Sequence, residues 1–65
     1  MNLKGKVSSI NTSANTAEVI LLEYDGVVTA PIPFYHAGAA LSATVGQFVI
    51  VAVFGSGDFN DGVIL

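Results

Sequence analysis

The sequence predicts a single all-β domain spanning residues 1–65, folded as a small five-stranded antiparallel barrel that is OB-like or, as an alternative, SH3-like. Valine, isoleucine and threonine make up more than a quarter of the residues, and β-branched side chains favour the half-buried surface of a sheet. No stretch keeps a 3.6-residue apolar period long enough to indicate a helix. Short apolar runs instead alternate with turn residues, which is typical of a small barrel or sandwich.

A polar turn separates the first two predicted strands. Residues 3–10 form the first strand, and the Asn-Thr-Ser-Ala-Asn sequence at residues 11–15 ends it, because Asn and Ser side chains hydrogen-bond to their own backbone. The second strand covers residues 16–24. One of its faces carries Ala17, Val19 and Leu21, and the other carries Ile20, Leu22 and Tyr24.

A hairpin is predicted between the second and third strands. Asp25-Gly26 separates two apolar runs, and this dipeptide favours a tight turn in which both central residues have a positive φ. The third run, residues 27–34, contains Pro31 and Pro33. Because proline cannot donate to a sheet ladder, this strand is predicted to lie at an edge or to fray at its end.

The second half of the chain predicts one irregular segment and two more strands. Residues 35–44, rich in alanine and glycine, form one helical turn or a plain loop. Gly46 then gives a turn before the fourth strand, residues 47–54. The Gly-Ser-Gly-Asp sequence at residues 55–58 forms the next turn, and a short fifth strand covers residues 61–65.

Two of these strands are apolar on both faces, and this feature predicts contact between subunits. In the fourth strand Phe48, Ile50, Ala52 and Phe54 alternate with three valines, whereas an antiparallel sheet that faces water alternates apolar with polar residues. The residues expected at the contact are Val49, Val51, Val53, Ile20, Leu22, Tyr24, Pro31, Pro33 and Tyr35. The opposite-parity residues of the fourth strand are an alternative to its valines. A second alternative is that residues 35–44 cover a central strand within one chain.

The composition agrees with burial by a protein partner. Only 11% of the residues are charged, 52% are hydrophobic, and the mean hydropathy is +0.70. There is no cysteine, which excludes disulfides and thiolate metal sites. The formal net charge is −3 and the two lysines are the only basic residues, so nucleic-acid binding is not expected. The longest apolar run, residues 48–54, is much shorter than the roughly 20 residues of a spanning helix, so membrane insertion by the chain itself is not expected.

The side chains that could carry chemistry do not form a catalytic, cofactor or metal site, and no enzyme activity is expected. His36 is the only histidine, and no serine lies in a nucleophile-elbow pattern. The favoured interpretation is a loop histidine beside Tyr35. The alternative is that copies of His36 meet at an oligomer axis, where pH or a metal acts on them. Asp58, Asn60 and Asp61 lack the spacing of a calcium loop and predict a hairpin turn.

Five short motifs follow one another along the chain. They are Lys4-Gly5-Lys6-Val7, Ala17-Glu18-Val19, Val27-Val28-Thr29-Ala30-Pro31-Ile32-Pro33, Val45-Gly46-Gln47-Phe48-Val49-Ile50-Val51 and Asp61-Gly62-Val63-Ile64-Leu65. In this order they resemble the small OB-fold domain of baseplate and tail-spike proteins of tailed bacteriophages, of the baseplate assembly protein V type. The C-terminal β-helical needle of the larger family members is not part of these residues.

The resemblance implies a virion structural protein without enzyme activity or cofactor. It implies a homo-oligomer, threefold or ring-shaped, that contacts other virion proteins in the tail, baseplate or neck after assembly in the host cytoplasm. A capsid cement or decoration protein is the first alternative, because it shares the small size, the β content and the dependence on assembly. An independent OB-like or SH3-like binding module is a further alternative.

Overall fold

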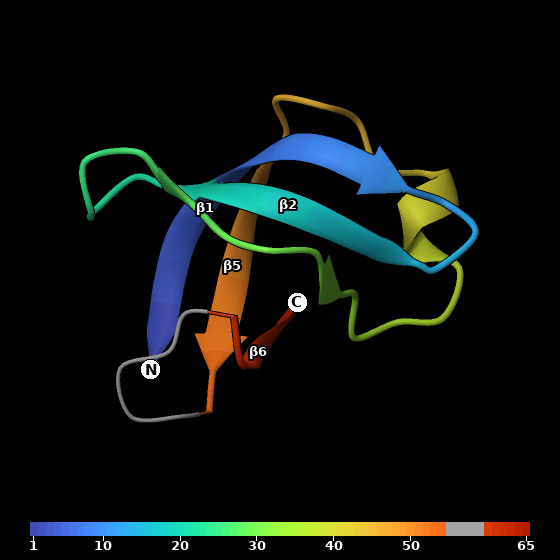
Figure 1. Ribbon diagram of the computed structural model, residues 1–65. Coiled ribbons are helices and arrows are strands. Elements are labelled where there is room, and N and C mark those ends of the chain that lie inside the picture. The colour runs from blue at the N-terminus through green and yellow to red at the C-terminus, as the bar shows by residue number, and fades with distance from the viewer. Residues whose placement is uncertain (55–59) are drawn as a thin grey trace.

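The computed structural model describes residues 1–54 and 60–65 as one curled antiparallel sheet of six strands with one short 3-10 helix (Figure 1). The elements are β1 (Asn2–Asn11), β2 (Thr16–Leu21), β3 (Val27–Val28), β4 (Ile32–Pro33), η1 (Ala39–Leu41), β5 (Phe48–Val53) and β6 (Gly62–Ile64). The predicted all-β class is therefore confirmed. The turn predicted at residues 55–58 lies outside the described residues.

β1 is the strand that joins the two halves of the sheet. The strand order is β3-β2-β1-β5-β6, with β4 also paired to β2. The N-terminal half of β1 pairs with β5, its C-terminal half pairs with β2, and Gly5 and Lys6 pair with both neighbours. A Cβ atom at Gly5 would collide with the side chain of Val19, so glycine lets the two strands approach closely where β1 curves.

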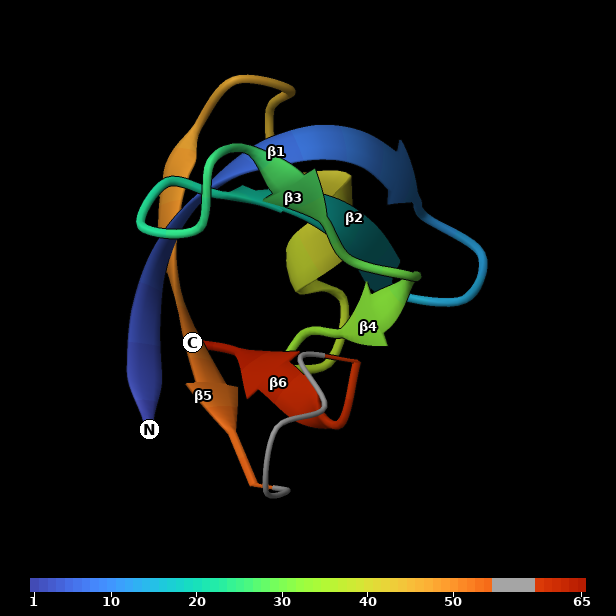
Figure 2. The ribbon, with the colours of Figure 1, turned by 60° about the vertical axis from the view of Figure 1, so that its left-hand side comes forward.

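The hairpin at Asp25-Gly26 forms as predicted. Asp25 and Gly26 have φ values of 54° and 76°, and Val28 and Val27 pair with Ile20 and Leu21 across it. However, β2 ends at Leu21 rather than at residue 24, so the loop covers residues 22–26. The predicted third strand is interrupted after β3 at residues 29–31, where Pro31 has no N–H to donate. It continues as the two-residue β4, which pairs again with β2 (Figure 2).

The sheet curls but is not closed into a barrel, which corrects the predicted barrel. Its two ends meet at one isolated parallel bridge between Phe34 and Ile64, beside a 2.8 Å hydrogen bond from the Tyr35 N–H to the Ile64 carbonyl. β4 contributes only Ile32 and Pro33 to ladder pairing. A segment interrupted by prolines offers too few donors for a continuous ladder at this seam.

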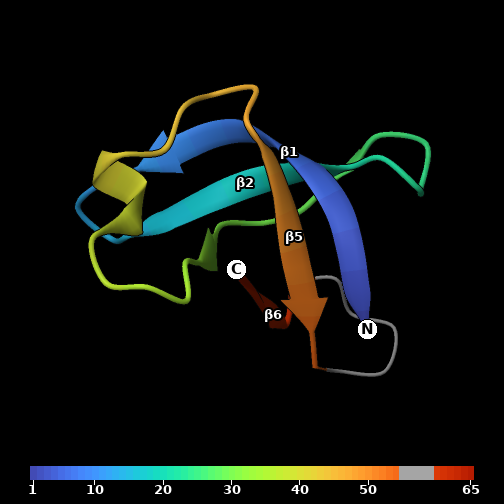
Figure 3. The ribbon, with the colours of Figure 1, turned by 180° about the vertical axis from the view of Figure 1, so that it is seen from behind.

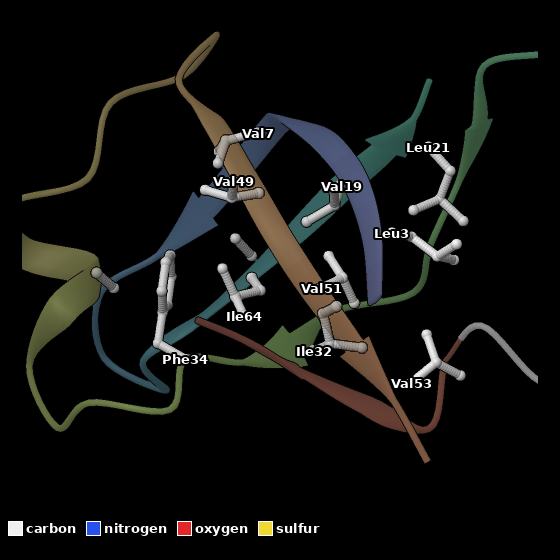
Figure 4. Close-up of a cluster of buried hydrophobic side chains, with 12 residues drawn as sticks. Leu3, Val7, Val19, Leu21, Ile32, Phe34, Val49, Val51, Val53 and Ile64 are labelled. Carbon is white, nitrogen blue, oxygen red and sulfur yellow. The ribbon is translucent and has the colours of Figure 1, made fainter. Parts of the chain in front are cut away.

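The core lies inside the curl, between β5 and β1 on one side and β4 and β6 on the other (Figure 4). Its buried members are Leu3, Val7, Ala17, Val19, Leu21, Ile32, Phe34, Ala40, Val49, Val51, Val53 and Ile64. Val49, Val51 and Val53 were expected to line a subunit contact, and the structure corrects this expectation. They face the core of their own chain, because β5 pairs with β1 in a register that places Val51 opposite the buried Leu3 and Val49 opposite Gly5.

Residues 35–44 contain the single helical turn, η1, that was one of the two predicted outcomes. Asn15 holds this segment against the β1–β2 turn. Its Oδ1 accepts from the Ala40 N–H at 2.9 Å, and its Nδ2 donates to the His36 carbonyl at 3.0 Å. Ala40 is buried beside Phe34, so the segment covers an open end of the curl and does not cover the outside of β5.

A buried threonine replaces a missing ladder contact between β2 and the segment after β3. Thr29 is 3% exposed, and its Oγ1 accepts a hydrogen bond of 3.1 Å from the Val19 N–H. The Thr29 N–H donates in turn to the Val19 carbonyl at 2.9 Å. The hydroxyl therefore satisfies a backbone donor that has no access to water, since Val19 is completely buried.

We expect Thr29→Val to lower the free energy of unfolding by about 1–3 kcal/mol, because the substitution keeps the shape but leaves the Val19 N–H unsatisfied. Thr29→Ser retains the hydroxyl and is the matched control, with a smaller loss. Urea unfolding followed by circular dichroism measures both. Equal stability of Thr29→Val and the wild type would contradict this role of the hydroxyl.

Candidate interaction surface on the outside of the sheet

The outside of the sheet carries large apolar side chains on β2, β3 and β5, with two lysines of β1 between them. Strand alternation turns Phe48 and Ile50 outward when the valines of β5 turn inward. Ile20 on β2 and Val28 on β3 share that face by register, and Leu65 borders it beyond β6. This outer apolar face is defined here as Ile20, Val28, Phe48, Ile50 and Leu65 together with Lys4 and Lys6.

The register places these residues in rows across the strands. One row runs from Val28 through Ile20 and Lys6 to Phe48. In the next row Lys4 is directly opposite Ile50. Directly opposed residues have Cβ atoms about 5 Å apart, so each row is a continuous surface. Figure 3 views the molecule from the side on which β5 lies nearest, with β6 behind it.

Phe48 and Leu65 are the most exposed apolar members of this face. Phe48 is 67% exposed and Leu65 is 54% exposed, although each is large enough to fill a core position. An open groove of about 590 Å³ is lined by Lys4, Phe48, Val49, Ile50 and Leu65. The Leu65 N–H donates to the Ile50 carbonyl at 2.9 Å and thereby fixes one wall of the groove. A contiguous exposed apolar surface of this kind is a candidate interaction surface.

The two lysines of the chain lie in the middle of this apolar surface. The Lys6 Nζ atom lies 5.5 Å from the centroid of the Phe48 ring, which is a cation–π geometry. Among the described residues, neither ammonium forms an ion pair. The methylene stems of Lys4 and Lys6 cover apolar surface while their charges remain available to a partner.

The structure separates the other predicted contact residues into two groups. Leu22 and Tyr24 are exposed in the loop that borders Lys4, and the Leu22 N–H donates to the Lys4 carbonyl at 3.2 Å. Pro33 pairs with Thr16 at the opposite end of β2. Pro31 and Tyr35, two residues before and after Pro33 in the sequence, are exposed. The Tyr35 ring packs edge-on against the His36 ring, with centroids 5.1 Å apart. Ile20 thus belongs to the outer apolar face, and Leu22 and Tyr24 lie in the loop that borders it. Pro31, Pro33 and Tyr35 do not join this face.

The groups considered for chemistry have structural roles where they are described. The Asn60 Oδ1 accepts from the Ala30 N–H at 2.8 Å, and the Asp61 carbonyl accepts from the Phe54 N–H at 2.8 Å. His36 is exposed beside Tyr35. In residues 1–54 and 60–65, no three His, Cys, Asp or Glu side chains gather as metal ligands. The same part of the chain holds no helix of the length and apolarity needed to cross a membrane.

The chain matches no protein-family model, no curated protein and no solved structure.

The two faces of β5 predict opposite responses to the same substitution. We expect Val51→Asp to unfold the domain or to cost more than about 4 kcal/mol, because it places a charge in the core at a residue with no exposure. Phe48→Asp is the matched change on the outside, and we expect it to alter the unfolding free energy of the monomer by less than about 1 kcal/mol. Urea denaturation at high dilution measures both. A larger loss for Phe48→Asp than for Val51→Asp would contradict the assignment of the faces.

Proposed function

We propose that the protein is a structural subunit that assembles by burying its outer apolar face against another subunit. The observation that carries the proposal is the exposure of Phe48, Ile50 and Leu65 side by side on a chain with only 11% charged residues. Burying a side chain of this size is worth about 1.5–3 kcal/mol, so a contact over this face supplies stability that a small core lacks.

We further propose that the fold is OB-like rather than SH3-like. If β3 and β4 count as one interrupted strand, β5 is the fourth strand, and the spatial order of the first four strands is 4-1-2-3. This order is that of a Greek key. The OB-fold is a five-stranded Greek-key barrel that is partly open, and both features support the assignment.

The proposed setting is the virion of a tailed bacteriophage, in the tail, baseplate or neck. Its support is the order of sequence motifs shared with the baseplate assembly protein V type, together with the Greek-key strand order. A subunit of such a particle is covered by its neighbours, which is consistent with a chain that leaves one face of its sheet apolar.

Sedimentation velocity over a range of concentrations tests the proposal. We expect the wild type to sediment as an oligomer, and the double variant Phe48→Ser/Ile50→Ser to associate at least about a hundredfold more weakly while keeping its circular dichroism spectrum. Leu41→Ser is the control, because Leu41 is 77% exposed on η1, away from the face.

A wild type that remains monomeric at every concentration would contradict assembly through self-contact. Unchanged association of the double variant would contradict the choice of face. The virion setting is tested by fitting the fold into density of an intact particle: copies in the tail, baseplate or neck support it, and copies on the capsid lattice would favour the decoration protein instead.

A further inference from the structure

We propose that the outer apolar face receives the loop between β2 and β3 of a second copy of the same chain, in a head-to-tail contact. This inference rests on the proposed function and names the partner. The loop, residues 22–26, is called the acidic loop, since it carries Glu23 and Asp25.

The lysines of the chain and the carboxylates of the acidic loop lie on different surfaces. The chain has two lysines and no arginine, and both lysines lie on the outer apolar face without an ion pair among the described residues. An occupant with carboxylates would neutralise Lys4 and Lys6, whereas an uncharged occupant would leave two ammonium groups desolvated. The favoured occupant is therefore both apolar and acidic.

The acidic loop has this composition. Glu23 and Asp25 are exposed there beside Leu22, which is 44% exposed, and Val27 at the loop's end is 46% exposed. The loop projects from the body of the sheet (Figures 1 and 3). The left-handed backbone at Asp25 and Gly26, with φ of 54° and 76°, sets the shape of the tip before any partner arrives.

No residue of the acidic loop lines the groove of its own chain. β1 lies between β2 and β5 in the sheet. The acidic loop leaves from the β2 side of β1, where the Glu23 Oε1 accepts from the Lys4 backbone N–H at 3.4 Å. The groove beside Phe48, Ile50 and Leu65 lies on the β5 side. Within one chain the acidic loop therefore reaches only the Lys4 edge of the groove, and the part beside Phe48, Ile50 and Leu65 is left for the loop of a second copy.

A contact between different surfaces of identical chains is heterologous. Such contacts produce closed rings when the rotation closes and open filaments when it does not. Each copy then contributes one acidic loop and one outer apolar face, so both surfaces are covered in the assembly. This arrangement accounts for the exposed apolar side chains on both the outer apolar face and the acidic loop of the same chain.

Charge reversal followed by mixing tests this pairing. Lys4→Glu places a carboxylate on the face beside Lys6 and keeps the original acidic loop, and Glu23→Lys places an ammonium group in the loop beside Asp25 and keeps the original face. We expect each variant alone to associate at least about tenfold more weakly than the wild type, because like charges then meet across the contact. An equimolar mixture should recover association, since each face meets the opposite loop. Sedimentation velocity measures the oligomer, and circular dichroism confirms that both variants fold.

Glu18→Lys is the matched control, because it changes the net charge by the same amount on β2 and not in the acidic loop. Its mixture with Lys4→Glu should not recover association. If Glu23→Lys alone associates as strongly as the wild type, the inference is overturned in favour of a face-to-face dimer. The inference is also overturned if the wild type assembles but the mixture of Lys4→Glu and Glu23→Lys does not. In both cases the proposed function would stand.

Absence of wild-type association would instead remove the proposed function itself. Binding of the monomeric wild type, but not of Lys4→Glu, to phosphatidylserine vesicles would assign the lysine-bearing face to an anionic lipid surface and would also overturn the inference.

Discussion

The packing of one sheet on itself is the constraint on which the rest of the structure depends. A sheet has two faces, and these 65 residues enclose one of them, because a small domain buries only part of its surface. Here the inward face is enclosed because the sheet curls, so that Val51 and Val19 meet Ile32 and Ile64 in one core. Within residues 1–54 and 60–65 no second layer covers the outward face, and its apolar side chains are exposed.

The curl itself depends on a few local features. β1 pairs with β5 at one end and with β2 at the other, and Gly5 permits the close approach where its two pairings overlap. Asn15 fastens the segment that closes one end of the core, and Thr29 supplies the hydrogen bond that the interrupted third strand cannot. These features fix which residues are inside, and therefore also fix the composition of the outer apolar face.

The local elements could be predicted from the sequence, whereas the assignment of faces could not. Asp25-Gly26 predicted the hairpin through its positive φ values, and Pro31 and Pro33 predicted the weak third strand. By contrast, β5 is apolar on both sides, so its own residues do not say which side is inward. The decision comes from pairing with β1 far away in sequence, where Lys4 lies opposite Ile50. The clean alternation of β1, with lysines outward, was the available indication. Whether the sheet closes into a barrel could not be predicted either, because the contact between its two ends depends on one bridge between Phe34 and Ile64.

The central claim is that another protein subunit covers the outside of β5. Covalent footprinting with a photoactivated carbene, read by mass spectrometry, measures the accessibility of individual side chains in the dilute and the concentrated protein. The account predicts that labelling of Phe48 and Ile50 falls as concentration rises, while labelling of Leu41 does not change. Equal labelling of Phe48 and Ile50 at all concentrations, in a sample shown to be oligomeric, would contradict it.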